Sequence, residues 1–184
     1  MEAPRAHGLT SGHPVTFDPV SRFCIAQLNV ARLVAPLDDP ALADFVDALE
    51  PVNALADAAP GFAWRLQTED GDATAIRVFD DDMVIVNMSV WRSIAALSDF
   101  VFRSDHRDVM VRRREWFERM AEAYLVLWWV PEGVPTVEEG RVKLERLRAD
   151  GPGPEAFTFR RPFPAPDSGT PTEAADDRSI CPTA

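Results

Sequence analysis

The stretch SDHRDVMVRRREWF, residues 104–117, combines a histidine with a run of arginines. Helical spacing places His106 on one face with Val109, Met110 and Arg113, because residues three, four and seven apart share a helix face. An imidazole on such an inward, apolar face can ligate iron or act as a general base near neutral pH. An arginine beside it can hold a carboxylate or propionate in a bidentate pair. The spacing therefore predicts His106 and Arg113 as catalytic residues.

The same stretch also has a structural interpretation. His106 lies near the expected start of the helix, where it can hydrogen-bond Ser104 or a backbone carbonyl. Asp105 and Asp108 flank it and can keep it protonated at the surface. The three consecutive arginines are spread by about 100° per residue, so we expect two of them to be solvated or paired with nearby acids.

Polar side chains within two strand-like runs form a second candidate set. Gln27 and Asn29 interrupt one apolar run, and Asn87 and Ser89 interrupt another. A buried polar group without a partner costs roughly 1–3 kcal/mol, so these side chains either line a ligand cavity or pair with one another and with ordered water in a solid core. In the cavity interpretation they combine with Trp64 or Arg65, with Trp91, and with Trp128 or Trp129.

Composition argues against several partners and chemistries. The net charge of −11 would repel nucleic acid and anionic lipid surfaces. We expect a cytoplasmic protein, because no apolar run approaches the roughly 20 residues of a membrane span and Glu2 stands where a signal peptide is basic. One histidine and one cysteine in the core argue against a zinc site, and neither a glycine-rich phosphate loop nor a nucleophile elbow is present.

The pattern of apolar residues predicts the elements that position these groups. In strand 83–91 one face carries Val84, Val86, Met88 and Val90, and the other carries Ile85, Asn87, Ser89 and Trp91. Asp39 is expected to cap a helix that Pro51 kinks or breaks near its end, and Thr136 and Glu139 form a capping box for a later helix that ends near Gly151. The expected strands are 23–34, 61–69 (with a hairpin continuation at 75–78), 83–91, 123–130 and a short one at 157–159, and a helix runs from Ser93 to Phe117 with a pause near Ser104.

This order, βαββαβ followed by αβ, is that of a ferredoxin-like α+β fold with a C-terminal helix and short strand. Two helices cover one face of a four-stranded antiparallel sheet, and the other face carries tryptophan and aliphatic residues. Pairing of two such sheets into a dimeric α+β barrel would cover it, which predicts a homodimer. We expect residues 1–21 to be a flexible leader, 22–164 the barrel domain and 165–184 a disordered tail.

Three runs carry a family resemblance: IAQLNVARLVAPLDDPALADFV, PGFAWRLQTEDGDATAIRVFDDDMVIVNMSVW and WFERMAEAYLVLWWVPEGVPTVEEG. Together they resemble the domain of unknown function 3291 family over residues 23–164. That family is assigned to the dimeric α+β barrel superfamily, so the resemblance implies the same fold and no established activity. The superfamily also includes haem-degrading and cofactor-free quinone-forming monooxygenases.

In the haem-degrading members an Asn of the first strand and a Trp and a His of the second helix form the site. Asn29 matches the first of these, Phe100 stands at the Trp position, and His106 comes about one helical turn early on the same face. These departures argue against haem degradation itself and leave haem, another planar ligand or no cofactor open.

The leading hypothesis is an oxygenase-like enzyme acting on a small hydrophobic or aromatic molecule. His106, Asn29 and Arg113 would be its catalytic residues. The alternative is a non-catalytic ligand-binding or sensing barrel, or a dimerisation module with a filled core. The predicted substrate-binding residues are Gln27, Trp64, Arg65, Asn87, Ser89, Trp91, Phe100 and Trp129.

Overall fold

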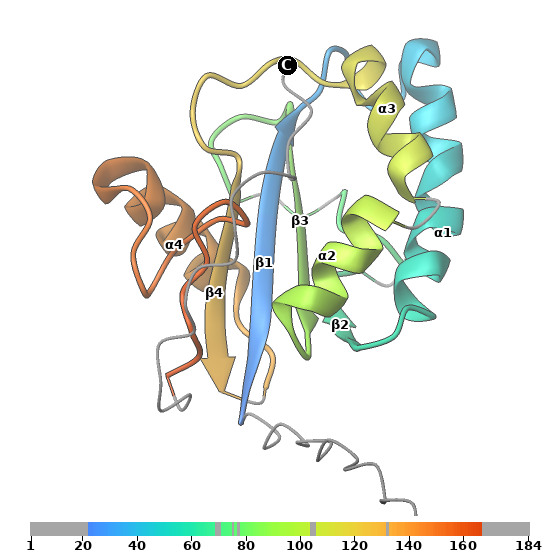
Figure 1. The fold of residues 1–184 in the computed structure, drawn as a ribbon. Helices are drawn as coiled ribbons and strands as arrows, with labels where there is room; N and C mark the ends of the chain where they lie inside the picture. The colour runs from blue at the N-terminus through green and yellow to red at the C-terminus, as the bar shows by residue number, and fades with distance from the viewer. Residues whose placement is uncertain are drawn as a thin grey trace, which may run out of the picture.

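The computed structural model describes residues 22–166 apart from 69, 70, 75, 77, 104, 105 and 132, and for 106–110 it describes the backbone alone. Helices pack on both sides of one antiparallel sheet, with α1, α2 and α3 on one side and α4 on the other (Figure 1). The elements are β1 (Phe23–Arg32), η1 (Pro40–Leu42), α1 (Ala43–Asp57), β2 (Phe62–Arg65), β3 (Val84–Trp91), α2 (Ile94–Arg103), α3 (His106–Trp116), β4 (Leu125–Pro131) and α4 (Val137–Asp150).

The four strands lie in the order β2-β3-β1-β4, and each neighbouring pair is antiparallel. This is the order and direction of the split βαβ pattern, so the predicted α+β, ferredoxin-like fold class is confirmed. β1 is central, because Gln27 lies opposite Ser89 of β3 on one side and Leu127 of β4 on the other. Every residue of β1 therefore projects either toward α1, α2 and α3 or toward α4.

The two sides of the sheet are called the inner face, toward α1, α2 and α3, and the outer face, toward α4. On the inner face Ile25 and Trp91 pack with Leu97 of α2. On the outer face Leu28 and Met88 pack with Leu144 of α4. The alternation predicted for β3 is confirmed, since its four aliphatic residues belong to the outer core and its other four to the inner face.

The helix predicted after Asp39 forms in two parts. The Asp39 carboxylate accepts the N–H of Ala41 at 2.8 Å and so caps η1. The helix then continues through Pro51 to Asp57, so the predicted break at Pro51 is wrong. Pro51 is exposed, which lets water reach the carbonyl that a proline leaves without its helical donor.

The outer face is covered by α4, which approaches closely at a glycine. A Cβ atom on Gly140 would lie 2.5 Å from Cδ1 of Leu28 and 3.2 Å from Sδ of Met88. Thr136 caps this helix as predicted, accepting the N–H of Glu139 at 3.1 Å. The Glu139 carboxylate, however, accepts the indole N–H of Trp128 at 2.9 Å, a contact that the predicted capping box does not include.

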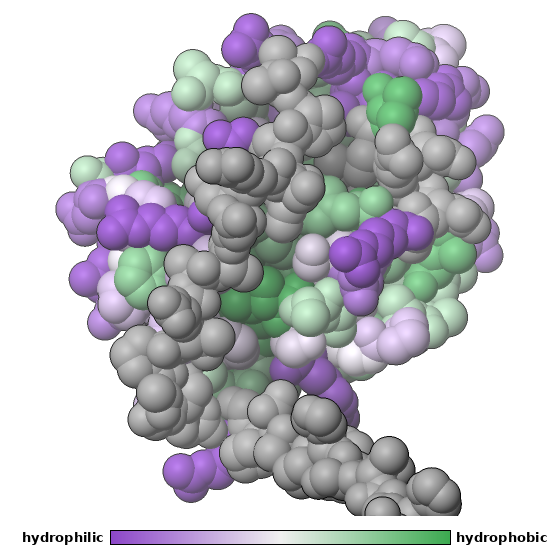
Figure 2. All heavy atoms as spheres, viewed as in Figure 1, coloured by the Kyte–Doolittle hydropathy of each residue, from purple (hydrophilic) through white to green (hydrophobic). Residues whose placement is uncertain are grey.

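Because α4 covers the outer face, an uncovered apolar face is no longer a reason to expect a homodimer. The aliphatic residues and Trp128 of the outer face, expected to need a second copy, are buried within the chain under α4. The physical reason is that the C-terminal helix supplies the apolar surface that a partner sheet would otherwise bring. Figure 2 shows hydrophobic side chains gathered near the middle of the view, between α4 and the other helices, with hydrophilic ones along the upper edge. The homodimer stays a prediction.

Two predicted strands are shorter than expected. β2 ends at Arg65, and the chain turns where the Thr68 N–H donates to the Asp72 carbonyl at 2.7 Å. The predicted hairpin continuation at 75–78 falls partly outside the described residues, and Ile76 and Val78 pack in irregular backbone against the outer core. The predicted final strand reduces to a single antiparallel bridge between Phe157 and Leu127.

Candidate functional site

A band of polar side chains crosses the middle of the inner face. Along β1, Gln27 and Asn29 lie between Ile25 and Ala31, which belong to two separate hydrophobic clusters. β3 repeats this arrangement, because its polar pair lies between Trp91 and Ile85. We call the band the polar belt and define it as Gln27, Asn29, Arg65, Asn87 and Ser89.

The belt is assembled by strand register. Arg65 of β2 lies opposite Ser89 of β3, and Ser89 lies opposite Gln27 of β1. Asn87 and Asn29 face each other one step further along the same two strands. Antiparallel neighbours directly opposite each other have Cβ atoms about 4.5–5.5 Å apart, so the sheet brings the belt residues into hydrogen-bonding reach.

Three hydrogen bonds link the buried part of the belt. The Trp91 indole N–H donates to Ser89 Oγ at 2.9 Å, and Ser89 Oγ donates to Gln27 Oε1 at 3.1 Å. Gln27 Nε2 donates to Asn29 Oδ1 at 2.7 Å. Trp91 is fully buried, and Gln27 and Ser89 are 6% and 7% exposed. These bonds satisfy groups that would otherwise be costly to bury.

The belt opens toward solvent at its two asparagines. Asn29 is half-buried and Asn87 is exposed. Both nevertheless project to the inner face of the sheet, the side of α1, α2 and α3 (Figure 1). Within the described part of the chain, no hydrogen bond runs from Asn29 Nδ2 or from the Asn87 side chain. The belt therefore ends in two carboxamides that a bound molecule can reach.

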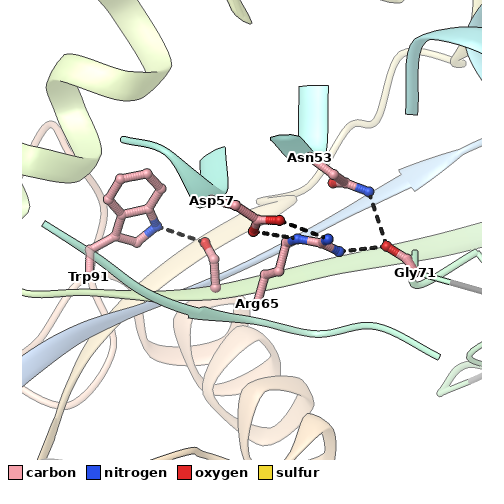
Figure 3. Close-up of polar contacts among 6 residues, drawn as sticks. Asn53, Asp57, Arg65, Gly71 and Trp91 are labelled. Carbon is pink, nitrogen blue, oxygen red and sulfur yellow. Dashed lines mark hydrogen bonds and ion pairs between the residues drawn. The ribbon is translucent and has the colours of Figure 1, made fainter. Parts of the chain in front are cut away.

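Arg65 closes the other end of the belt through α1. Its guanidinium forms a bidentate pair with Asp57, with N–O distances of 2.8 and 3.1 Å, and donates to the Gly71 carbonyl at 2.6 Å (Figure 3). Asn53 donates to the same carbonyl at 3.4 Å. Because its charge is neutralised by Asp57, Arg65 holds β2, α1 and the following turn together and is not set up as an anion clamp.

The aromatic residues next to the belt fill the end of the inner face. The Trp91 ring stacks on Phe100 with centroids 5.0 Å apart, and Phe62 meets it edge-on at 5.3 Å. Trp129 donates its indole N–H to the Phe163 carbonyl at 2.7 Å. Protein rings thus occupy the positions over Trp91 where a planar cofactor would stack, so the described residues at this end do not fit haem.

Two other predicted site residues, Trp64 and Arg113, contact residues outside the belt. Trp64 packs against the outer core, on the opposite side of the sheet from Gln27. Arg113 donates to the Tyr124 hydroxyl at 3.1 Å and its guanidinium lies 4.8 Å from that ring.

The side chain of His106 lies outside the described residues, so its predicted role stays a prediction.

The neighbouring arginine has a structural role. Arg112 donates to Glu115 and to Asp44 of α1, and its guanidinium lies 4.9 Å from the Trp116 ring. The hydrogen bonds to Glu115 and then to Asp44 raise the pKa of Arg112 above its ordinary value. This agrees with the expectation that arginines of this run pair with nearby acids.

Sequence reasoning missed two residues of α1: Asp57, which pairs with Arg65 of the belt, and Asn53, which donates to the same Gly71 carbonyl as Arg65. Both lie on α1, for which the sequence pattern predicts only an apolar stripe facing the core. Their separation of one helical turn places both on one face, and this was the available signal. Nothing in the sequence, however, indicates that this face meets Arg65.

The described residues hold neither a metal site nor a membrane span. No three His, Cys, Asp or Glu side chains of the described ranges gather as they would around a metal ion. No helix there is both long and apolar enough to cross a bilayer.

A depression of about 290 Å³ lies at the end of α4, lined by residues 150–156 and by Arg146. Arg146 is paired there with Glu155, so its charge is already neutralised.

The solved structures that match this one are distant in sequence. A protein of unknown function from Nitrosomonas europaea, NE2512, is 14% identical with a TM-score of 0.38, covering 63% of this chain and 95% of its own. Rv0793 from Mycobacterium tuberculosis is 13% identical with a TM-score of 0.38, covering 62% and 98%. A monooxygenase of Streptomyces coelicolor, ActVA-Orf6, solved with nanaomycin D, is 14% identical with a TM-score of 0.37, covering 63% and 93%.

The sequence itself gives a more definite assignment. No curated protein was found to match the chain. The family described as domain of unknown function (DUF3291) matches residues 24–173, which include nearly all of the strands and helices described above. The match spans well over half of the chain, and the chain belongs to the DUF3291 family.

Proposed function

We propose that the polar belt binds a small, electron-rich aromatic molecule through an oxygen atom, and that the domain oxidises this molecule with dioxygen. The observation that supports this is a row of amide and hydroxyl groups between two hydrophobic clusters, ending in the accessible carboxamides of Asn29 and Asn87. An apolar site with a few convergent polar groups is typical of small-molecule binding. A core with only a structural role would have no need to bring polar groups to solvent at this point.

The belt suits a reaction that builds negative charge on an oxygen atom. A carboxamide such as that of Asn29, which is half-buried and held by Gln27, stabilises an oxyanion more than water does, because its N–H donor needs little reorganisation. Loss of a proton from a phenol or an anthrone places charge on such an oxygen. The anion of an anthrone is electron-rich enough to reduce dioxygen by itself, so for such a substrate the proposal requires no metal or flavin.

The overall chemistry balances for an anthrone. A base removes one proton from the CH₂ carbon, and the anion transfers one electron to dioxygen. The two radicals combine into a C–O bond and, with the proton, give a hydroperoxide. Its O–O bond then breaks as water leaves and a C=O bond forms, so that CH₂ and O₂ yield C=O and H₂O. The base is predicted to be His106, and Asn29 and Asn87 would hold the oxyanion.

Oxygen uptake with 1,8-dihydroxyanthrone tests this proposal, with product formation followed by the quinone absorption. We expect catalysed uptake of one O₂ per quinone formed. Asn29→Leu should lower the rate by about 100- to 1,000-fold, the range for loss of one oxyanion donor. Asn53→Leu is the matched control, because it removes the same group from outside the belt and should leave the rate within about twofold. Equal rates for the two variants would refute the assignment to the belt.

A binding role without chemistry is the second candidate. It is supported by the mutual hydrogen bonding of Trp91, Ser89 and Gln27, which leaves few belt groups free to take part in a reaction. In that case the wild-type protein would bind aromatic phenols, and Asn29→Leu would bind them more weakly. Oxygen uptake with the anthrone would equal that of a protein-free control. A protein that neither binds the anthrone nor oxidises it would have a filled core.

A further inference from the structure

The hydrogen bonds of the belt have a direction, and Trp91 sets it. An indole N–H can only donate, so Ser89 Oγ must accept from Trp91 at 2.9 Å. The Ser89 hydroxyl hydrogen then needs an acceptor, which Gln27 Oε1 provides at 3.1 Å. This orients the Gln27 carboxamide, whose Nε2 must point the other way, to Asn29 Oδ1 at 2.7 Å.

The reversed orientation of Gln27 would leave a buried group unsatisfied. With its Nε2 toward Ser89, the Ser89 oxygen would accept from both Trp91 and Gln27, and the serine hydrogen would have no acceptor in this row. Ser89 is 7% exposed and Gln27 6% exposed, so water cannot readily replace the missing partner. A buried donor left without a partner is costly, and the observed direction is therefore favoured.

From this we infer that Trp91, Ser89 and Gln27 act as a positioning relay that turns the Nδ2 group of Asn29 toward the opening of the belt. Asn29 Oδ1 is held by Gln27, so the group left for a ligand is the N–H donor. At Asn29 the site thereby favours a molecule that presents an acceptor oxygen, such as a phenolate or a carbonyl. A molecule that presents only a donor, such as a protonated amine, would meet the wrong end of the Asn29 carboxamide.

This inference rests on the proposed function for the identity of the bound oxygen, but the direction of the relay can be measured without a ligand. Scalar couplings across hydrogen bonds report which nitrogen donates to which carbonyl. In protein labelled with ¹⁵N and ¹³C, we expect a coupling from Gln27 Nε2 to Asn29 Cγ. A coupling from Asn29 Nδ2 to Gln27 Cδ would show the reversed direction and overturn the inference.

The consequence for binding can be tested with 4-nitrophenol, whose phenolate absorbs in the visible range. The measured quantity is the pKa of the bound probe, obtained from absorbance against pH at saturating protein. A donor aimed at the oxygen favours the phenolate, so the pKa of the bound probe should lie below that of free 4-nitrophenol. A tenfold preference corresponds to one pKa unit, which is about 1.4 kcal/mol.

Trp91→Phe removes the indole N–H and keeps an aromatic ring against Phe100. Gln27→Met removes the relay carboxamide without adding charge. In both variants the Asn29 carboxamide is free to turn, and the preference for phenolate should fall about tenfold, the loss of one charge-assisted hydrogen bond. The matched control is Trp128→Phe, which also removes an indole N–H bond, the one to Glu139, but on the outer face. It should leave the pKa of the bound probe unchanged.

The outcomes separate the inference from the proposed function. If wild type binds the probe and Trp91→Phe leaves the preference for phenolate unchanged, the relay is refuted while the site stands. If wild type does not bind 4-nitrophenol or the anthrone, the proposed function fails, and the coupling measurement still decides the direction of the relay. A merely structural role for Trp91 would lower stability in Trp91→Phe without moving the pKa of the bound probe.

Discussion

The two faces of the sheet are built from alternate residues of the same strands, yet they differ in kind. Leu28 projects outward into a hydrophobic core with Met88, Trp128 and the helix α4. Gln27, its neighbour in sequence, projects inward into the polar belt and is nearly as buried. One face therefore buries apolar area without interruption, and the other interrupts its apolar area with hydrogen-bonding groups.

This difference is the basis for proposing that the two faces have different roles, one in stability and one in binding. Burial of apolar surface contributes about 25 cal/mol per Å², whereas an internal hydrogen bond contributes about 1 kcal/mol net and a missing partner costs more. Replacing both partners of a belt hydrogen bond with apolar groups of the same shape would thus cost the fold little. That the chain retains amides there agrees with a binding role for the inner face and a structural role for the outer one.

The sharpest test of the comparison uses the adjacent pair at the centre of β1. Leu28→Ala leaves a cavity under α4 and should lower the free energy of unfolding by about 2–5 kcal/mol. Gln27→Met keeps the volume but leaves the buried Ser89 hydroxyl without its acceptor, so it should lower the free energy of unfolding by about 1–3 kcal/mol, less than Leu28→Ala. Urea denaturation followed by tryptophan fluorescence measures both. Equal losses would show that the belt is as structural as the outer core.

Arg65 tests the boundary between the two roles, because it belongs to the belt but is paired with Asp57. Arg65→Met removes a bidentate ion pair and the bond to the Gly71 carbonyl, and should lower the free energy of unfolding by about 1–2 kcal/mol. A double-mutant cycle with Asp57→Asn isolates the pair. Binding of 4-nitrophenolate should be unchanged, since Arg65 is neutralised. A large loss of phenolate affinity would instead make Arg65 an anion-binding residue.

The alternation of side chains along β1 and β3 is sufficient to assign their residues to two faces from the amino-acid pattern. β2 shows where this reasoning fails. The sequence leaves Trp64 and Arg65 as alternatives, and simple alternation would put Trp64 on the same face as Phe62. The register shifts between these two residues, so Phe62 joins the inner cluster and Trp64 the outer core. An irregularity of this kind depends on pairing with β3 and has no local sequence signal.

Contacts between distant segments are also beyond the reach of local patterns. The helix of residues 137–150 is predicted with its cap, but not the face that it covers, although Gly140, Leu144 and Leu147 share one side of it. The bond from Trp128 to Glu139 and the contact of Asp57 with Arg65 join elements whose approach is set by packing of the whole domain. Local patterns determine which groups are present, and tertiary packing decides which of them meet.

Gly140 sharpens the comparison from the outer side, where close packing leaves no free volume. Gly140→Ala would place a Cβ against Leu28 and Trp128, and overpacking of this kind costs about 1–3 kcal/mol. Alanine gains about 1 kcal/mol of helix propensity over glycine, so the net loss of stability should be about 1 kcal/mol. Val142→Ala, at an exposed position of the same helix, is the control and should not destabilise. A stabilised Gly140→Ala variant would mean that α4 is not held against the sheet.

The smallest effect is expected at the rim of the sheet, outside both faces. The Asp81 carboxylate accepts the Met83 N–H at 2.9 Å and pairs with Arg32 at 3.0 Å. The backbone bond from Met83, and then Arg32, hold the pKa of Asp81 below its ordinary value of 3.8. The folded state thus releases this proton more readily than the unfolded one, so its stabilisation is present above pH 3.8 and is lost as the pH falls through the lowered pKa.

Asp81→Asn should therefore flatten the acid limb of stability against pH below about pH 4, with little change at pH 7 relative to effects at either face. Thermal unfolding between about pH 2 and pH 7 measures this, and Asp80→Asn, at the nearby exposed position, is the control. An acid limb identical to that of wild type would show that the Asp81 contacts do not persist in solution. Rim contacts of this kind change how stability depends on pH in acid. The variants of Leu28 and Gln27 test instead whether the stability of the fold and the proposed binding depend on different faces of the sheet.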